Sequence, residues 1–504
     1  MNSQSLSLLS VAAFCSGCAA QTPSLVQMPS TTQTSTSAPQ AKVAQAPALQ
    51  TAARSPASTT KFDLKWSPVA GEVAPIIEVC PLQYGKTWAY SVEIDDGPAS
   101  TLSVVAPLLE GFSFSDAPPG MSGGKAHPFV GGAAIYLARF DSGNPTLLSR
   151  KDTALLRARG WGMLNHSYWH SGNHWDKTQA NTPEQFRREL FWSQCLWPDV
   201  VGGGRAATHF VYPNGDPGYG KYLSEFGLAS ASRVGGASPH RADGSAVWGD
   251  LDRNYLDEGV WSQSNNALAG LSESPKAGDF TIDFTHGIEA PGSINYKRWQ
   301  TRLEHIAGKW GAKGEDSLWC APTDAVVDYA RAAAVARVSA KVGGVHVELP
   351  PDVPGSALTL HLRGLDKRAH LVAPVGGALF RQGDQAWITT PVLGQVGVKP
   401  PAKLKCVWRG PVGDVTLDAL HKIAGVRVLQ QGDAGTQWKM SIQVGSEGGP
   451  LTEIVAPDKA VLGQGWGTWQ LFPIVPDRQA ITAQSIHATP NKVFAQMEVW
   501  VLDE

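Results

Sequence analysis

The sequence predicts a multidomain chain in which an α/β domain, built on a parallel sheet or barrel, precedes all-β segments. At 504 residues the chain exceeds the size of one ordinary hydrophobic core, so we expect two or three domains. Short apolar runs alternate with helical patterns from about residue 61 to 338, as in strands joined by crossover helices. After about residue 338 the helix signal fades. Apolar and polar residues then alternate between Gly and Pro turns, which predicts strands.

The first 18 residues are expected to be a signal peptide, of the lipoprotein type. The apolar run from Leu6 to Phe14 is too short to span a bilayer, and small residues precede Cys18, as at a bacterial lipoprotein cleavage site. Cys18 would then carry the lipid. Because no Lys or Arg precedes the apolar run and Cys15 stands where an aliphatic residue is usual, a plain secretory signal and a mis-assigned start codon stay open as alternatives.

Residues 19–60 are rich in Thr, Ser, Pro, Gln and Ala. Such a segment buries too little apolar surface to offset its ordering entropy, so it is predicted to be a disordered linker. A polar tether behind a lipidated cysteine predicts an exported chain, either an outer-membrane or periplasmic lipoprotein or else a secreted protein. The lipid would be its anchor to the membrane, because no transmembrane helix is expected in the mature chain.

Charge and cysteine content narrow the classes further. The chain has 42 Lys and Arg against 44 Asp and Glu, a formal net charge of −2, and no basic block, which argues against nucleic acid as a partner. Four cysteines follow the predicted lipid site, and in an exported chain they can pair. Cys80 precedes the first proposed strand of the α/β domain and Cys320 ends the last one, so they form the first pair to test. The other two are Cys195 and Cys406.

The elements of the α/β domain, residues 61–338, follow from local patterns. Strands are predicted at residues 88–94, 133–137, 162–165, 207–212 and 280–284. Helices are predicted at residues 103–109, 147–159, 182–197, 296–310 and 323–334; Pro183 stands at the first helical position of the third. A small all-β module over residues 339–400 has strands at 345–349 and 358–362, and a second β segment over 401–504 has strands at 426–428, 441–444 and 497–501.

An acidic pair and a histidine pair stand at two predicted strand ends. In a parallel barrel the C-terminal strand ends share one face, so these side chains can meet. A metal ion that activates water needs two or three protein ligands, an open position and a nearby base. The pattern therefore predicts Asp96, His166 and His170 as ligands, with Asp95 as the base. Taken separately, Asp-Asp-Gly is also typical of a turn, and histidines four apart of a solvated pair.

Four segments, in this order, strengthen the metal interpretation: Glu93–Gly97, His166–His170, Phe210–Gly215 and Phe284–Ile288. They resemble the Thr-Phe-Asp-Asp-Gly, His-Ser/Thr-x-x-His, Phe-x-Tyr-Pro-x-Gly and final histidine motifs of the polysaccharide deacetylase family, which includes chitin, peptidoglycan and nodulation-factor deacetylases. The stretch from Leu318 to Ala330 also resembles the end of that domain. This resemblance spans about 250 residues and implies a distorted β/α barrel.

The resemblance also implies a role for each residue of the site. It implies Asp95 as the catalytic base, His286 as the general acid and the backbone N–H of Tyr212 as an oxyanion donor. It implies a divalent metal, most often Zn²⁺, on Asp96, His166 and His170. The third motif lacks the Arg with which many members orient the base. No fourth motif is evident, and Asp252 and Arg253 are its candidates. His174 continues the histidine spacing and could be a fourth ligand if the stretch were helical. Because residues 171–173 favour a loop, we expect His174 to be a rim or structural residue.

The last hundred residues resemble a discoidin-like, galactose-binding β-sandwich at residues 415–417, 423–428, 438–448 and 495–500. Members commonly bind glycans through loops, which here could involve Trp408, Trp466 or Trp469. Near the predicted metal site, Trp169 and Trp175 fit stacking on sugars and core packing equally well.

These expectations converge on an exported, metal-dependent polysaccharide deacetylase that hydrolyses N- or O-acetyl groups of a glycan. One alternative is a glycan-binding lipoprotein with a vestigial deacetylase domain, which the absence of bound metal would favour. Another is a hydrolase of the same barrel that acts on non-sugar amide bonds. Substrate choice would reside in loops such as Ser232–Gln263, which match no motif.

Overall fold

The computed structural model describes residues 60–170, 182–235, 239–242, 250–257, 266–351, 353–394, 399–431, 440–446, 448–454, 467–490 and 494–503. The predicted signal peptide, Cys18 and nearly all of the predicted linker lie outside these residues, as do His174, Trp175 and Trp466. Among the helices in the described ranges, none combines the length and apolar character that a membrane crossing requires.

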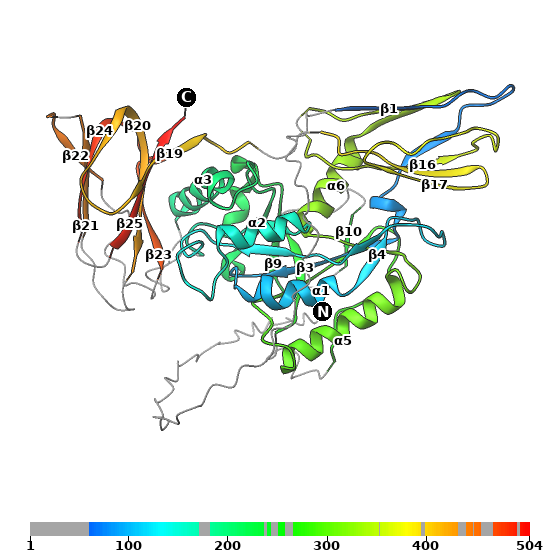
Figure 1. Cartoon of the computed structure of the whole chain (residues 1–504), viewed down its shortest axis with the longest axis horizontal. Helices are drawn as coiled ribbons and strands as arrows, with labels where there is room; N and C mark the ends of the chain where they lie inside the picture. Colours follow the sequence, from blue (N-terminus) through cyan, green and yellow to red (C-terminus); the bar gives the residue numbers. More distant parts are fainter. Residues whose placement is uncertain are drawn as a thin grey trace, which may run out of the picture. The chain divides into compact units, whose positions relative to one another are not determined.

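Seven parallel strands close into a barrel. In barrel order they are β3 (Trp88–Ile94), β6 (Gly132–Ile135), β7 (Gly162–Asn165), β8 (His209–Val211), β9 (Ser230–Val234), β11 (Leu251–Tyr255) and β12 (Asp279–Thr285). Of these strands, β3 and β9 are labelled in Figure 1. The ring closes because β12 pairs in parallel with β3 along its whole length, from Asp279 opposite Trp88 to Thr285 opposite Ile94. The predicted parallel α/β architecture is confirmed for this part of the chain.

Two further strands extend this sheet. β13 (Leu318–Cys320) pairs in parallel with the first half of β3, which leaves the second half of the same edge to β6. β10 (His240–Arg241) pairs antiparallel with β12. The short strands β4 (Ser113–Ser115) and β5 (Ala126–Pro128) form a separate antiparallel pair.

Helices join and cover the barrel strands. They are α1 (Ala106–Glu110), which continues the π-helical turn Thr101–Val105, α2 (Arg150–Ala158), α3 (Pro183–Val200), α5 (Ile294–Trp310) and α6 (Thr323–Val335). All five predicted helices are confirmed to within a few residues. α3 begins as expected, with Pro183 in its first turn and a capping box in which Thr182 and Gln185 each bond the other's backbone N–H.

Two small antiparallel sheets draw strands from both sides of the barrel in the sequence. In the three-stranded sheet, β15 (Gly344–Glu348) lies between β1 (Lys61–Lys65) and β14 (Arg337–Lys341). The four-stranded sheet has the order β17 (Ala378–Gln382), β18 (Gln385–Thr389), β16 (Thr359–Arg363) and β2 (Ile76–Val79). Residues 61–79, which local patterns group with the barrel, thus pair with strands that follow it.

The C-terminal sheet, as we call strands β19–β25, is antiparallel. Its strands are β19 (Leu404–Gly410), β20 (Val415–Gln430), β21 (Met440–Gly445), β22 (Leu451–Ile454), β23 (Thr468–Pro473), β24 (Ile481–Pro490) and β25 (Phe494–Leu502). The first part of β20 pairs with β24, and its second part pairs with β25 on one edge and β23 on the other. The resemblance to discoidin-like sandwiches stays a prediction.

The four described cysteines are thiols, so the expected Cys80–Cys320 pairing does not form. Cys80 follows β2 in the four-stranded sheet, whereas Cys320 ends β13 in the barrel sheet with its Sγ beside the Val130 carbonyl. The two strands belong to different sheets. The positions of the cysteines in the sequence could not show this. Burial raises the pKa of the Cys80 thiol, and that of Cys195, to about 12, so both are poor nucleophiles.

Candidate metal centre and active site

The predicted site residues gather at one end of the barrel because each follows a parallel strand. Asp95 and Asp96 follow β3, His166 follows β7, Tyr212 follows β8 and His286 follows β12. The C-terminal strand ends of a parallel barrel are the edge at which substrate-binding residues collect. The fold therefore brings together segments that lie almost two hundred residues apart in the sequence.

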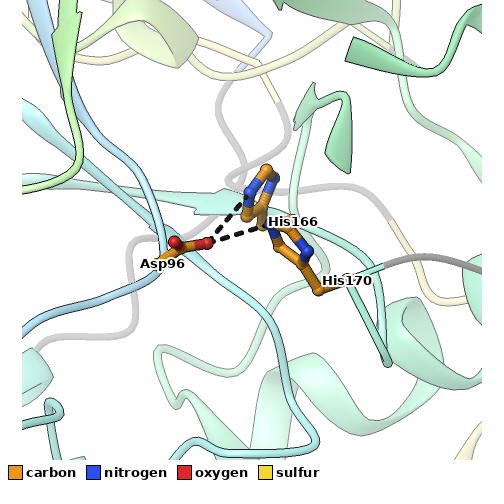
Figure 2. Close-up of side chains that lie close together, drawn as sticks. All are labelled: Asp96, His166 and His170. Carbon is orange, nitrogen blue, oxygen red and sulfur yellow. Dashed lines mark ion pairs between the residues drawn. The ribbon is translucent and has the colours of Figure 1, made fainter. Parts of the chain in front are cut away.

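Asp96, His166 and His170 present three potential ligand atoms to one point (Figure 2). These atoms all lie within 4.8 Å of one another. Nε2 of His170 is 3.0 Å from Oδ1 of Asp96, and Nε2 of His166 is 3.5 Å from the same oxygen. One carboxylate and two imidazoles form a donor set that suits Zn²⁺ and related divalent ions.

The proton positions of this cluster favour a cation between its members. Nδ1 of His166 lies 2.8 Å from the carbonyl oxygen of Val211, which can only accept, so Nδ1 carries the proton. In the neutral ring, Nε2 then offers a lone pair towards Asp96, whose Oδ1 is buried without a hydrogen-bond donor. Two acceptors that face each other repel, and a metal ion at that point removes the conflict. The residues present therefore fit a metal site.

Ionisation of the cluster also suits a cation. Burial raises the pKa of Asp96, but the adjacent rings of His166 and His170 outweigh burial and hold it well below its usual range. Burial lowers the pKa of His170, with a smaller opposing effect from Asp96, so this ring is neutral near pH 7. An anionic carboxylate and neutral imidazoles are the ligand forms that bind metal.

The backbone around these residues adopts left-handed conformations. Asp96, Ser167 and His170 have φ angles of 68°, 72° and 74°, which cost roughly 1 kcal/mol or more each for residues other than glycine. The surrounding bonds hold the loop in place: the Ser167 N–H donates to Asn165 Oδ1 at 2.8 Å, and the His170 N–H donates to Ser167 Oγ at 2.9 Å. These bonds support the strained backbone between the two histidines, whose rings both face Asp96.

Asp95 is held by an arginine that its motif does not contain. Nη1 and Nη2 of Arg253 donate to Oδ1 and Oδ2 of Asp95 at 2.8 and 3.0 Å. The Arg253 guanidinium is fully buried and stacks on the Phe284 ring, with 3.8 Å from its carbon to the ring centroid. Arg253, from β11, thus supplies the orientation that the third motif lacks.

A second buried carboxylate shares the same arginine. Arg253 Nη1 also donates to Glu93 at 2.9 Å, and Glu93 accepts from the hydroxyls of Ser232 and Thr323 at 2.9 and 2.5 Å. Burial raises the pKa of Glu93, but the opposing effects of Arg253 and, next in size, His209 are larger together. The pKa of Glu93 therefore falls to about 2. One guanidinium therefore pairs with two carboxylates inside the barrel.

His286 is supported by a carboxylate that the sequence analysis did not single out. Its Nδ1 lies 2.8 Å from Oδ2 of Asp257 and 3.3 Å from the hydroxyl of Tyr255. The hydrogen bond that the His286 ring donates to Asp257 raises the pKa of His286, while burial lowers it and the charge of Asp95 raises it. Since Nδ1 is committed to Asp257, Nε2 is the atom left for proton transfer to a substrate.

The expected oxyanion role of Tyr212 does not fit its backbone. The Tyr212 N–H donates to the carbonyl oxygen of Ser232 at 2.9 Å, as part of the pairing between β8 and β9. An amide already used in this way is not available to a substrate oxygen. The sequence pattern placed Tyr212 correctly at a strand end but could not show that the strand pairing continues past Val211.

The two candidates for the fourth motif separate in the structure. Asp252 pairs with Arg233, with 2.6 Å between its Oδ1 and Nε, away from the metal ligands. Arg253, the next residue, points inward to Asp95 because side chains alternate along a strand. Asp257 lies two residues past the end of β11, so it follows a barrel strand as the other site residues do. Recognition of β11 as a strand would have revealed both Arg253 and Asp257.

Two of the tryptophans considered for sugar stacking, Trp169 and Trp469, are buried. Trp169 is 8% exposed and Trp469 is 2% exposed, so neither presents a face to a sugar. Trp469 packs under the Arg427 guanidinium, 4.2 Å from its ring centroid to the guanidinium carbon. Trp408 is half-buried against the core of the C-terminal sheet. A glycan surface built on Trp469 is therefore excluded by its burial.

No protein-family model matches the chain, and no curated protein matches it. Among solved structures it is similar to the Streptococcus pyogenes deacetylase PplD in complex with acetate, with 13% sequence identity and a TM-score of 0.25. This similarity covers 32% of the present chain and 62% of that chain, which is less than two thirds of its length. A likeness at this TM-score decides neither the fold nor the activity of the present chain.

Proposed function

We propose that this chain is a metal-dependent deacetylase that hydrolyses N- or O-acetyl groups of a polysaccharide. One observation carries the proposal. Three residues that could hold a metal ion lie at the same barrel end as Asp95, which Arg253 holds, and His286, which Asp257 holds. Metal ligands, a fixed base and a supported acid are the parts that hydrolysis of an acyl group requires. All of them occupy one end of the barrel.

Asp96, His166 and His170 would hold the metal, most often Zn²⁺ in such donor sets. A divalent ion bound there polarises an acyl oxygen and lowers the pKa of a water molecule, which supplies the electrophilic part of the chemistry. The side chains themselves supply position and proton transfer.

Asp95 accepts the proton of the attacking water. Its two oxygens each accept one bond from Arg253, but a carboxylate has about four acceptor sites, so one remains for water. The arginine fixes the direction of that site. A base held in place in this way loses little entropy when the water approaches.

His286 delivers a proton to the leaving amine or alkoxide through Nε2. Its Nδ1 bond to Asp257 orients the ring and stabilises the protonated form, as the raised pKa indicates. The ring is half-exposed, which leaves Nε2 accessible from solvent. Protonation of the departing group completes hydrolysis and returns acetate and the free sugar amine or hydroxyl.

We further propose that the protein is exported and anchored by a lipid on Cys18, as an outer-membrane or periplasmic lipoprotein, with secretion as the alternative. This location suits a polysaccharide substrate, since cell-surface and extracellular glycans lie on that side of the membrane. Lipid analysis of the purified protein and of a Cys18→Ala variant tests the anchor. Retention of lipid by the variant would contradict it.

The activity is tested by acetate release from chitin oligomers, peptidoglycan, poly-N-acetylglucosamine and acetylated xylan. Wild-type protein should release acetate from at least one of them, and Asp95→Ala, His166→Ala and His286→Ala should not, while remaining folded by circular dichroism. Near-normal release by any of the three variants would overturn the assignment. Glycan binding without release and without stoichiometric metal would instead favour a vestigial, glycan-binding domain.

A further inference from the structure

Residues 166–170, which we call the histidine loop, form hydrogen bonds with two other elements of the fold. From α3, Glu189 contributes Oε2, which accepts from the Trp169 N–H at 3.1 Å. The other contact is with β23 of the C-terminal sheet. The second contact is unexpected because this strand follows the loop by three hundred residues.

Three hydrogen bonds tie the histidine loop to β23 in a closed ring. The Ala138 N–H donates to the Tyr168 carbonyl at 2.8 Å, and the Trp469 N–H donates to the Ala138 carbonyl at 2.6 Å. The Tyr168 hydroxyl completes the ring by donating to the Trp469 carbonyl at 3.2 Å. Tyr168 lies between the two histidine ligands in sequence, so its side chain anchors the segment that carries them.

A buried ion pair lies beside the contact between Tyr168 and Trp469. Nε of Arg427 lies 2.5 Å from Oε2 of Glu498, and the guanidinium also stacks on Trp469 and lies beside the Tyr168 hydroxyl. Tyr168, Arg427 and Glu498 are each at most 1% exposed. A buried charge tolerates little displacement because separation leaves it unpaired, so this cluster fixes the position of β23 on the loop.

Glycines allow the two surfaces to approach. A Cβ on Gly467, just before β23, would lie 2.6 Å from Oγ and 2.9 Å from the carbonyl oxygen of Ser142 in the barrel. A Cβ on Gly425 would lie 2.7 Å from the ring of Trp192 on α3, whose Nε1 donates to the Val475 carbonyl at 2.8 Å. The contact is therefore close-packed beyond the ring of hydrogen bonds.

We propose that the C-terminal sheet is part of the support of the metal centre, and that Tyr168 is the positioning residue through which β23 holds the histidine loop. The left-handed conformations at Ser167 and His170 need such support, because an unsupported loop would relax towards unstrained angles and turn His170 away from Asp96. The inference rests on the proposed function, since it takes His166 and His170 as metal ligands.

The test compares three variants of the full chain. Tyr168→Phe removes the bond to Trp469 and keeps the ring, and Gly467→Ala pushes β23 away from Ser142. Gly448→Ala is the matched control: Gly448 has φ +70°, close to +76° at Gly467, but has no heavy atom within 4 Å of its would-be Cβ. Zn²⁺ affinity is measured by competition with a chromophoric chelator, and loop mobility by hydrogen–deuterium exchange over residues 166–170.

We expect Tyr168→Phe and Gly467→Ala to weaken Zn²⁺ binding about tenfold, as loss of support behind metal ligands does, and to speed exchange in the histidine loop. Gly448→Ala should match wild type in both readouts, although its backbone strain is similar. Wild-type affinity and exchange in the first two variants would overturn the inference. So would equal weakening by Gly448→Ala, because the effect would then be general destabilisation.

The proposed function can fail separately. If wild-type protein bound no stoichiometric Zn²⁺, the proposed metal-dependent function would be wrong. Hydrogen–deuterium exchange in residues 166–170 would still decide whether β23 holds the histidine loop. Faster exchange in Tyr168→Phe and Gly467→Ala alone would then support the structural contact without a metal. Unchanged exchange would remove it.

Discussion

The adjacent carboxylates of Asp95 and Asp96 differ because of what each one touches. Asp95 turns inward to Arg253 and is buried, whereas Asp96 faces two histidines and is partly exposed. The left-handed backbone of Asp96 and the following Gly97 allows both side chains to line one pocket. Chemical identity alone would make the two residues equivalent, so their separate roles follow from position.

Loss of Arg253 should damage both activity and stability. Arg253→Gln leaves Glu93 and Asp95 as buried carboxylates without a full counter-charge, which typically costs about 3–5 kcal/mol of unfolding free energy. Acetate release should fall about a hundredfold or more because the base loses its orientation. Chemical denaturation and acetate assays check both. Arg233→Gln is the control on the neighbouring strand, and a similar loss there would contradict a specific role for Arg253.

Asp257 should control the alkaline limit of activity. A general acid must hold its proton, so activity is lost as pH rises through the pKa of His286, and Asp257 holds that pKa above its ordinary value. Asp257→Asn removes the charge, lowers the pKa of His286 and should shift the alkaline limb of the pH–kcat profile to lower pH. Asp252→Asn should leave the profile in place. An unshifted limb in Asp257→Asn would separate Asp257 from proton transfer.

At the scale of single elements, local patterns predicted the helices and most barrel strands. α3 and β7 were predicted closely because capping residues and continuous apolar runs mark them. β9 and β11 were missed because their inward residues are polar: Ser230 and Ser232 bond His209 at 2.7 and 2.8 Å, and Arg253 bonds Glu93. A barrel filled by a hydrogen-bonded network breaks the apolar pattern that identifies a buried strand.

The link between β7 and α3 should show in stability. The Asn165 amide donates to Ser193 and Gln194 of α3 at 3.0 Å each, and its oxygen accepts from the Ser167 N–H. Asn165→Ala leaves these buried groups without partners and should lower the unfolding free energy by about 2–4 kcal/mol, measured by urea denaturation. Asn144→Ala, which loses bonds only within its own turn, is the control. An equal loss of unfolding free energy in both variants would show that the β7–α3 hydrogen bonds do not contribute specifically to stability.

At the scale of the molecule, the pairings that organise the chain are long-range. β1 and β2 precede the barrel but pair with β15 and β16 behind it, and β23 packs against the histidine loop. Local sequence marks each strand but not its partner, because pairing depends on where the rest of the chain has folded. The order of motifs predicted the metal ligands; the supporting residues Arg253, Asp257 and Tyr168 required the tertiary structure.

Metal binding should stabilise the whole described unit. Ala424, Leu471, Val475 and Trp500 of the C-terminal sheet belong to the same apolar cluster as the barrel core, so the two should unfold together. An ion that binds only the native state adds about 2.7 kcal/mol when its free concentration is 100 times Kd. Thermal unfolding followed by near-ultraviolet circular dichroism should show one transition that rises with Zn²⁺, and His170→Ala should abolish the rise. Two transitions, of which Zn²⁺ moves only one, would contradict a shared core.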